Sequence, residues 1–214
     1  QHGSHVGIKP DFSLITLDED RMALLDQVIA KLNCDISSIP SDRKSLLVLL
    51  DRFFSESYTG GSIVAWMSHT PQWLPKLFVG YCTVLQEINR LDYGSLLYFA
   101  KKLLSENTGV TRLTRLAWRF VCVDEFQDTN YQQWNLLRRL CAGWTPGDGR
   151  TLFVVGDPKQ SIYGFRKAEV RLFQEAKKGV PTDSHQTLPM VPLVLHTNFR
   201  SRSHLIAWCN ELFS

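Results

Sequence analysis

The stretch that decides the fold is Phe120–Asn130, which reads FVCVDEFQDTN. It opens on an apolar run, Phe120–Val123, that is too short for a helix and rich in β-branched side chains. Such a run is typical of a fully buried strand in a parallel sheet. Asp124 and Glu125 follow directly, so we expect both carboxylates at the carboxyl end of the strand, where open α/β sheets bind ligands. Two carboxylates there predict a site for Mg²⁺, which also binds phosphate oxygens.

The acidic pair alone has a plainer interpretation, because a carboxylate after a strand is commonly a solvated turn or the cap of a helix. Two further polar motifs favour the ligand site, since each follows a predicted strand. Gly156–Gln160 comes after the strand Leu152–Val155, and Asn198–Arg202 comes just beyond the strand Leu193–Leu195. Because the carboxyl ends of parallel strands share one edge of a sheet, we expect the three motifs to meet in one crevice.

The composition is that of a globular protein. Of the 214 residues, 44% are hydrophobic and 21% are charged, and the net charge of +3 permits a polyanionic partner without demonstrating one. The five cysteines are scattered and form no C-x-x-C pair. We therefore expect reduced thiols in a cytoplasmic protein, and neither zinc nor disulfides. The longest apolar runs fall short of the roughly 18 residues of a membrane span, so no membrane partner is expected.

Helical periodicity dominates the first half of the chain. Gln1–Gly7 resembles the remnant of an expression tag and is therefore left out of the fold prediction. Amphipathic helices are expected over Asp18–Asn33, from an N-cap at Ser41, from Pro71 and from an N-cap at Asp92, each with a leucine or aromatic face. This half is therefore predicted to be all-helical, and its apolar stripes are predicted to form a core rather than a cofactor site.

The pattern changes around Asn107–Gly109, beyond which short apolar strands alternate with helices. Helices are expected at Tyr131–Ala142, Ala168–Lys178 and Ser203–Phe213, and Thr182–Pro192 is expected to be a polar loop. Alternation of this kind is typical of βαβ units and a parallel sheet. The fold class predicted from the residues is α/β.

Three motifs resemble those of the superfamily 1 DNA helicases, the UvrD/Rep/RecB group. VDEFQDTN, Val123–Asn130, resembles their Walker B motif at every position. GDPKQSIYGFR, Gly156–Arg166, resembles motif III in its RecB/AddA form, although the family usually continues with Gly-Ala-Asp where this chain has Lys167–Glu169. LHTNFRSRS, Leu195–Ser203, resembles motif IV. The resemblance covers the chain from about Leu91 to the C-terminus.

The resemblance implies a fold and a division of the chain. The sheet would be part of a RecA-like parallel sheet of the P-loop NTPase type, and residues 107–214 would be the C-terminal part of the first RecA-like ATPase domain. Residues 8–106 would be the all-helical subdomain that is inserted in that domain, and residues 1–7 would be the tag remnant. The implied cofactors are ATP and Mg²⁺.

The resemblance also implies how the nucleotide is handled. Asp124 would hold Mg²⁺, and Glu125 beside it would act as the general base on the attacking water. Gln160 would sense the nucleotide, and its amide is suited to this because it can both donate and accept. Arg200 would contact the γ-phosphate as an arginine finger, because its guanidinium stays charged and forks onto phosphate oxygens. A lone surface arginine is more often paired with a carboxylate.

Motif III further implies contacts with DNA. Tyr163, Phe165 and Arg166 would bind single-stranded DNA, since aromatic rings beside a cation form a stacking platform for unpaired bases. The plainer interpretation is that both rings pack against the sheet. Gln127 and Asp128 are expected to link the acidic motif to its neighbours. Expected partners are single- and double-stranded DNA and a second subunit of a helicase–nuclease complex.

No G-x-x-x-x-G-K-[ST] sequence occurs in the chain, so the loop that cradles a triphosphate is missing from it. We therefore expect a piece of an ATP-dependent DNA helicase or helicase–exonuclease, inactive by itself, that couples ATP hydrolysis to movement along single-stranded DNA in repair or recombination. The alternative is a non-catalytic, helicase-like partner that binds DNA or protein. A stand-alone Mg²⁺-dependent phosphohydrolase is a third interpretation, weakened because nothing in the chain grips the substrate.

Overall fold

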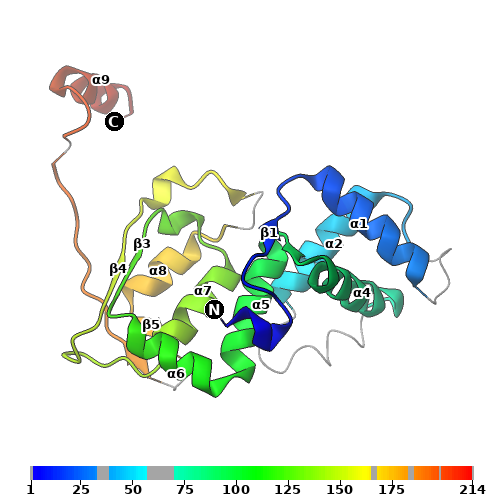
Figure 1. Cartoon of the computed structure of the whole chain (residues 1–214). Coiled ribbons are helices and arrows are strands. Elements are labelled where there is room, and N and C mark those ends of the chain that lie inside the picture. Colours follow the sequence, from blue (N-terminus) through cyan, green and yellow to red (C-terminus); the bar gives the residue numbers. More distant parts are fainter. Residues whose placement is uncertain are drawn as a thin grey trace.

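The computed structural model describes residues 2–32, 39–56, 70–164, 168–182, 186–197 and 199–213. Helices form one side of the molecule, and a small parallel sheet backed by helices forms the other (Figure 1). The elements run in the order η1 (Gly3–Val6), β1 (Ser13–Leu14), α1 (Asp18–Lys31), α2 (Arg43–Glu56), α4 (Trp73–Ile88), β2 (Arg90–Leu91), α5 (Tyr93–Glu106), α6 (Thr108–Ala117), β3 (Phe120–Val123), η3 (Phe126–Asp128), α7 (Tyr131–Leu140), β4 (Thr151–Val154), η4 (Pro158–Gln160), α8 (Arg171–Lys177), β5 (Val180–Pro181), β6 (Thr187–Leu188) and α9 (Ser203–Phe213).

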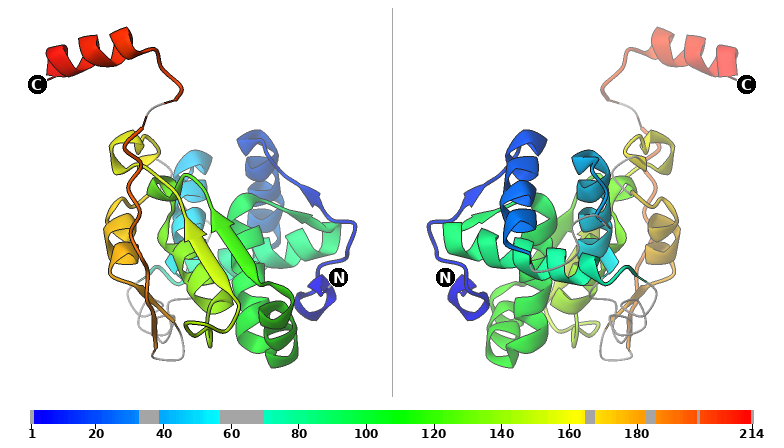
Figure 2. Two further views of the ribbon diagram at one scale, coloured as in Figure 1. Left: turned by 90° about the vertical axis from the view of Figure 1, so that its left-hand side faces the viewer. Right: turned by 90° about the vertical axis from the view of Figure 1, so that its right-hand side faces the viewer.

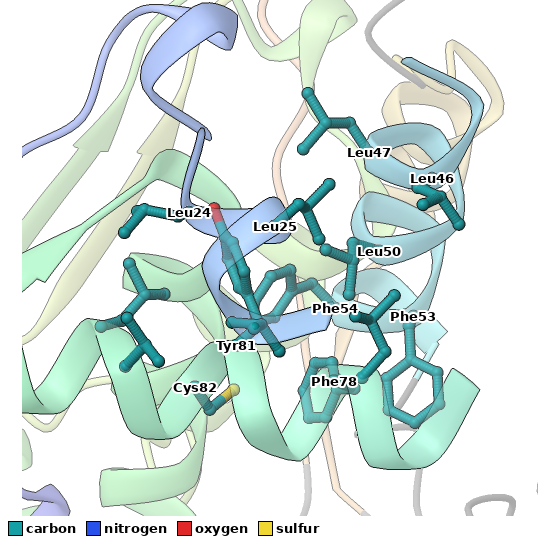
Figure 3. Close-up of a cluster of buried hydrophobic side chains, with 14 of the residues drawn as sticks. Leu24, Leu25, Leu46, Leu47, Leu50, Phe53, Phe54, Phe78, Tyr81 and Cys82 are labelled. Carbon is teal, nitrogen blue, oxygen red and sulfur yellow. The ribbon is translucent and has the colours of Figure 1, made fainter. Parts of the chain in front are cut away.

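The helices α1, α2, α4 and α5 enclose a large apolar cluster, here called the helical core, whose buried residues lie between Val6 and Phe99. The sequence predicted this packing, because apolar side chains recur at helical spacing along each helix. Phe54 and Tyr81 are both completely buried. Figure 3 shows how their rings lie among leucines from α1 and α2. The ring centroids of Phe54 and Phe78 are 4.8 Å apart in an edge-on arrangement, which favours their contact.

A buried charge network ties the same helices together. Asp92 caps α5 as predicted: its side chain accepts from the backbone N–H of Ser95 at 2.7 Å. The carboxylate also accepts from Nε of Arg21 at 3.0 Å and from the hydroxyl of Tyr81 at 2.9 Å. Arg21 reaches on to Asp51 of α2 at 2.5 Å, so it joins α1, α2 and α5. Burial by itself would lower the pKa of the Arg21 guanidinium, but the two carboxylates raise it above its ordinary value, so the charge is kept inside the fold.

Several predictions for the first half were wrong in detail. Its helices are joined by a short parallel pair, β1 and β2, so this half is not all-helical. The cap of α2 is Asp42 rather than Ser41, because the Asp42 carboxylate accepts from the backbone N–H of Ser45 at 3.2 Å. Helix α6 was missed, although Asn107 caps it through the N–H of Val110. Val6, within the expected tag remnant, is buried in the helical core.

Strands β3 and β4 pair in parallel, with Phe120 opposite Thr151 and Val123 opposite Val154. Their inner face packs on a second cluster, here called the sheet core, whose buried residues lie between Phe126 and Val180 and include side chains from α7 and α8. The left view of Figure 2 looks onto the strands with the helices behind them.

The outer face of this sheet is open. Phe120 is 77% exposed and Phe153 is 51% exposed, and Cys122 between them is exposed too. The prediction of a fully buried strand was therefore wrong. Side chains alternate between the two faces of a strand, and in the described chain helices cover one face alone.

The third predicted strand, Leu193–Leu195, does not form. In the described residues this segment pairs with no strand, and Leu195 is 91% exposed. Within the predicted loop Thr182–Pro192, strand β6 forms and pairs antiparallel with β5, which ends just before the loop. Helix α9 forms over the predicted residues but buries none of them, and it stands away from the body of the molecule (Figures 1 and 2). Among the described residues, no helix has the length and apolarity to cross a bilayer.

Candidate functional site

The parallel register brings the polar ends of β3 and β4 to one edge of the sheet. The backbone continues the pairing past both strands: the N–H of Val155 donates to the carbonyl of Val123 at 2.8 Å, and the N–H of Phe126 donates to that of Val155 at 2.9 Å. Asp124 and Glu125 therefore leave β3 beside the loop Gly156–Gln160 that leaves β4. This is the edge where a parallel sheet binds ligands.

The chain turns sharply at the acidic pair. Glu125 has φ 50° and ψ 40°, in the left-handed region that residues other than glycine seldom adopt. Its N–H donates to the Asp124 carboxylate at 2.9 Å, and its carbonyl accepts from the N–H of Asp128. Both carboxylates remain exposed at the surface. A strained turn that presents two adjacent carboxylates is a feature of functional sites.

Gln127 joins the two strand ends. The residue is buried, with 1% exposed, and its side-chain amide both donates and accepts a hydrogen bond. Nε2 donates to Oε2 of Glu125 at 2.6 Å, and Oε1 accepts from the backbone N–H of Asp157 at 3.1 Å. The predicted linking role of Gln127 is thus confirmed at the level of contacts. Asp128 also links the motifs, since the Ser161 hydroxyl lies 3.4 Å from its carboxylate and shares its one proton between that carboxylate and the Gln127 carbonyl.

The loop after β4 is organised around Asp157. The carboxylate accepts from the N–H of Lys159 at 3.0 Å and from Nε2 of Gln160 at 2.9 Å. These two donors, the Gln160 amide foremost, hold the pKa of the Asp157 carboxyl below its ordinary value. Gln160 therefore lies at the same edge as Glu125, exposed, with its amide turned onto its own loop.

Gly156 makes room for this arrangement. A Cβ on Gly156 would overlap Oε1 of Gln127 and would lie 3.1 Å from the backbone nitrogen of Phe126. A glycine also allows the chain to leave a strand by a tight bend. The close approach of a buried side chain from the neighbouring motif is the stronger reason for a glycine.

The structure places the other predicted residues less completely. Tyr163 is half-buried, and its carbonyl accepts from the N–H of Ala168 at 3.3 Å. Phe165 and Arg166 lie outside the described residues. Arg200 is exposed in the segment that leads away from the body to α9 (Figure 1), because the strand expected to position it is not formed. Asp124, Glu125 and Gln160 thus come together, and Arg200 does not join them.

A groove of about 410 Å³ runs beside the acidic pair, between β3 and α7. Its floor is apolar, with Val121, Val123 and Leu140 among its residues, and its acidic rim includes Asp124 and Glu125. None of the described residues that line it is a lysine or arginine, so its charge suits a cation and not a triphosphate. Within the described ranges no group of three metal-ligating side chains occurs. Two carboxylates still fit Mg²⁺, which takes its remaining oxygens from phosphate and water.

Two residues of the site were missed from the sequence. Asp157 organises the loop after β4, and Ser161 donates to the Gln127 carbonyl at 3.3 Å. The signal for Asp157 was present, because an aspartate followed by proline is a common start of a short helix or turn. Nothing in the local sequence indicates the partner of Ser161, which comes from the other strand end.

The chain is similar to known proteins over most of its length. The family model for the UvrD/REP helicase N-terminal domain matches residues 1–181. The RecBCD enzyme subunit RecB of Chlamydia muridarum is 39% identical over 114 residues, which is 53% of this chain and 10% of that protein. An ATP-dependent helicase/nuclease subunit of Lactococcus lactis subsp. lactis is 35% identical over 125 residues, 58% of this chain and 10% of that protein. Its counterpart in Streptococcus pyogenes serotype M49 is 33% identical over 134 residues, 63% of this chain. The chain spans about a tenth of the length of these relatives.

Proposed function

The chain belongs to the UvrD/REP helicase N-terminal domain family, and from that premise we propose that it is part of the motor of an ATP-dependent DNA helicase or helicase–nuclease acting in DNA repair or recombination. The observation that carries the proposal is the shared edge of β3 and β4. Asp124 and Glu125 leave one strand there, Gln160 follows the other, and Gln127 joins them.

The proposed roles follow from the chemistry of each side chain. Asp124 holds Mg²⁺, which when bound neutralises phosphate charge, and Glu125 accepts the proton of the attacking water. Gln160 orients toward the γ-phosphate once its amide leaves Asp157. Arg200 stabilises charge on the γ-phosphate after its segment is drawn to the site, because a guanidinium forks onto phosphate oxygens.

The proposal also includes parts of the fold that lie outside this chain. We propose that the sheet is part of a larger RecA-like sheet and that residues 8–106 are a subdomain inserted in it. The open outer face of β3 and β4 supports this, as does the segment Leu193–Leu195, which pairs with no strand of the described chain. The phosphate-cradling loop would come from another part of a longer protein, so the chain alone does not hydrolyse ATP.

Glu125→Gln tests the motor in the full-length protein. Turnover of ATP should fall by about a hundredfold or more, the usual range for loss of a general base, while nucleotide binding is retained. Glu175→Gln, an exposed carboxylate on α8, is the matched control. Unchanged turnover in the Glu125 variant would refute the assigned base.

DNA binding is proposed for motif III, with Tyr163, Phe165 and Arg166 as the contacts. Phe165→Ala should weaken binding of single-stranded DNA, measured by fluorescence anisotropy, by about tenfold, since stacking on an aromatic ring contributes about 1–3 kcal/mol per base. Phe213→Ala, an 82% exposed ring on α9, is the control. Equal affinities of the two variants would contradict the assignment.

The second candidate function is a helicase-like partner without catalysis. The segment that carries Arg200 favours it, because this segment forms no strand in the described chain and leads away from the body to α9. The parent reading frame separates the candidates. A phosphate-cradling motif about a hundred or more residues upstream would support the motor, and a native start codon near Ile8 would support the partner.

A further inference from the structure

A continuous line of hydrogen bonds runs from the acidic pair to the end of the other strand. It passes from the Glu125 carboxylate to the Gln127 amide, from that amide to the backbone of Asp157, and from the Asp157 carboxylate to Gln160. Each contact is between 2.6 and 3.1 Å, within the range of good hydrogen bonds. The two groups with proposed chemical roles, Glu125 and Gln160, are the ends of this line.

Gln127 is suited to the middle of the line by its chemistry. A side-chain amide donates from nitrogen and accepts at oxygen, so one residue can hold a carboxylate and an N–H at the same time. A glutamate there would set a second negative charge against Glu125, and a methionine would keep the volume but lose both bonds. Because Gln127 is 1% exposed, water has little access to replace either contact.

The backbone of Gln127 is held as well. Its carbonyl accepts from the Ser161 hydroxyl, which comes from the same loop as Gln160. The absence of a side chain on Gly156 leaves the space that the Gln127 amide oxygen fills. The amide therefore has little freedom to rotate unless the loop after β4 moves with it.

We infer that Gln127 is a positioning residue that couples the Glu125 carboxylate to the loop carrying Gln160. The inference rests on the proposed function, since that function gives the coupling a purpose. A ligand at the acidic pair would shift Asp157, and with it the hydrogen bond that holds the Gln160 amide. The inference goes beyond that function because it assigns to a buried amide the transmission between two motifs.

The coupling is measured by Mg²⁺ titration of the 214-residue chain, followed by backbone NMR. In the native chain, Mg²⁺ should shift the amide signals of Asp124 and Glu125 and also those of Asp157 and Gln160. In Gln127→Met the first pair should still respond, and the shifts of the second pair should be lost, because methionine makes neither of the two hydrogen bonds that join Glu125 to Asp157. An equal response of Asp157 in both proteins would overturn the coupling.

A second measurement needs no metal, so it separates the coupling from the proposed function. Glu125→Ala removes the acceptor of the Gln127 amide, and hydrogen exchange of the Asp157 amide should then quicken by about tenfold. Glu175→Ala should leave that exchange unchanged. If exchange at Asp157 is the same in native and Glu125→Ala chains, the coupling is refuted. If exchange quickens but Mg²⁺ shifts no signal, the coupling stands and the metal site fails.

Discussion

The helical core and the sheet core differ in how completely the described chain encloses them. The helical core is surrounded by α1, α2, α4 and α5, and Phe54 and Tyr81 within it are completely buried. The sheet core lies under one face of β3 and β4, while Phe120 and Phe153 on the other face are exposed. The helical core is therefore enclosed by its helices, whereas the sheet that holds the polar site is open on one face.

The difference also extends to polar groups. In the helical part the charged network of Arg21 and Asp92 is buried and fastens helices to one another. In the sheet part the polar groups Glu125 and Gln160 lie at the surface, and the buried Gln127 lies between them. The buried charges of the helical part therefore stabilise the packing of its helices, and the exposed polar groups of the sheet part are available to a ligand.

The largest expected effect comes from a matched pair of phenylalanines. Phe54→Ala opens a cavity in the helical core and should lower the free energy of unfolding by about 3–5 kcal/mol, since the ring is completely buried. Phe120→Ala should change it by less than about 0.5 kcal/mol, because an exposed side chain has little packing to lose. Urea denaturation measures both. A comparable loss in the two variants would mean that the open face is covered in solution.

The buried charge network gives the next effect. Asp92→Asn keeps the oxygen that caps α5 but replaces the oxygen that accepts from Arg21 and Tyr81. Leaving these donors in a buried site should cost about 2–3 kcal/mol of unfolding free energy. Asp18→Asn is the control, because that carboxylate also contacts Arg21 but its side chain is 70% exposed. Equal stability of the two variants would show that the network does not fasten the helices.

Gly156→Ala tests the junction of the two strand ends. The added methyl group would overlap the Gln127 amide oxygen, and since the amide is held at both ends, the expected cost is about 1–2 kcal/mol of overpacking. Gly164→Ala is the control, because a Cβ there meets nothing within 4 Å. Thermal unfolding measures both. A Gly156 variant as stable as the control would mean that Gln127 can move aside freely.

The sequence predicted what local pattern determines. Strands β3 and β4 and helix α7 were predicted from short apolar runs that alternate with helices, and Asp124 and Glu125 were placed by their position after a strand. Helix α6 was missed because its threonines, valine and glycine are weak helix formers. Its cap at Asn107 and the apolar spacing of Val110 and Leu113 were the available signal.

Predictions that depended on a neighbouring strand or on a covering layer were wrong. Leu193–Leu195 has the composition of a strand, but a strand forms only against another edge, and the described residues supply none to it. The expected placement of Arg200 depended on that strand, so its role stays a prediction. Burial of Phe120 likewise depended on a covering layer that the described chain does not provide. The pairing of Gln127 with Asp157 spans thirty positions and has no local signature.

The smallest effect, and the most direct probe of the open face, is cysteine reactivity. Cys122 is exposed on the outer face of β3, whereas Cys82 and Cys141 are buried and burial raises the pKa of each thiol to about 12. A raised thiol pKa leaves less thiolate at about pH 8, and thiolate is the reactive form. Iodoacetamide at that pH, read by mass spectrometry of peptides, should therefore label Cys122 within minutes and spare the other two until the chain is denatured. Protection of Cys122 in the native chain, with labelling restored on dilution, would mean that a second copy covers the sheet. Protection at every concentration would contradict the open face itself.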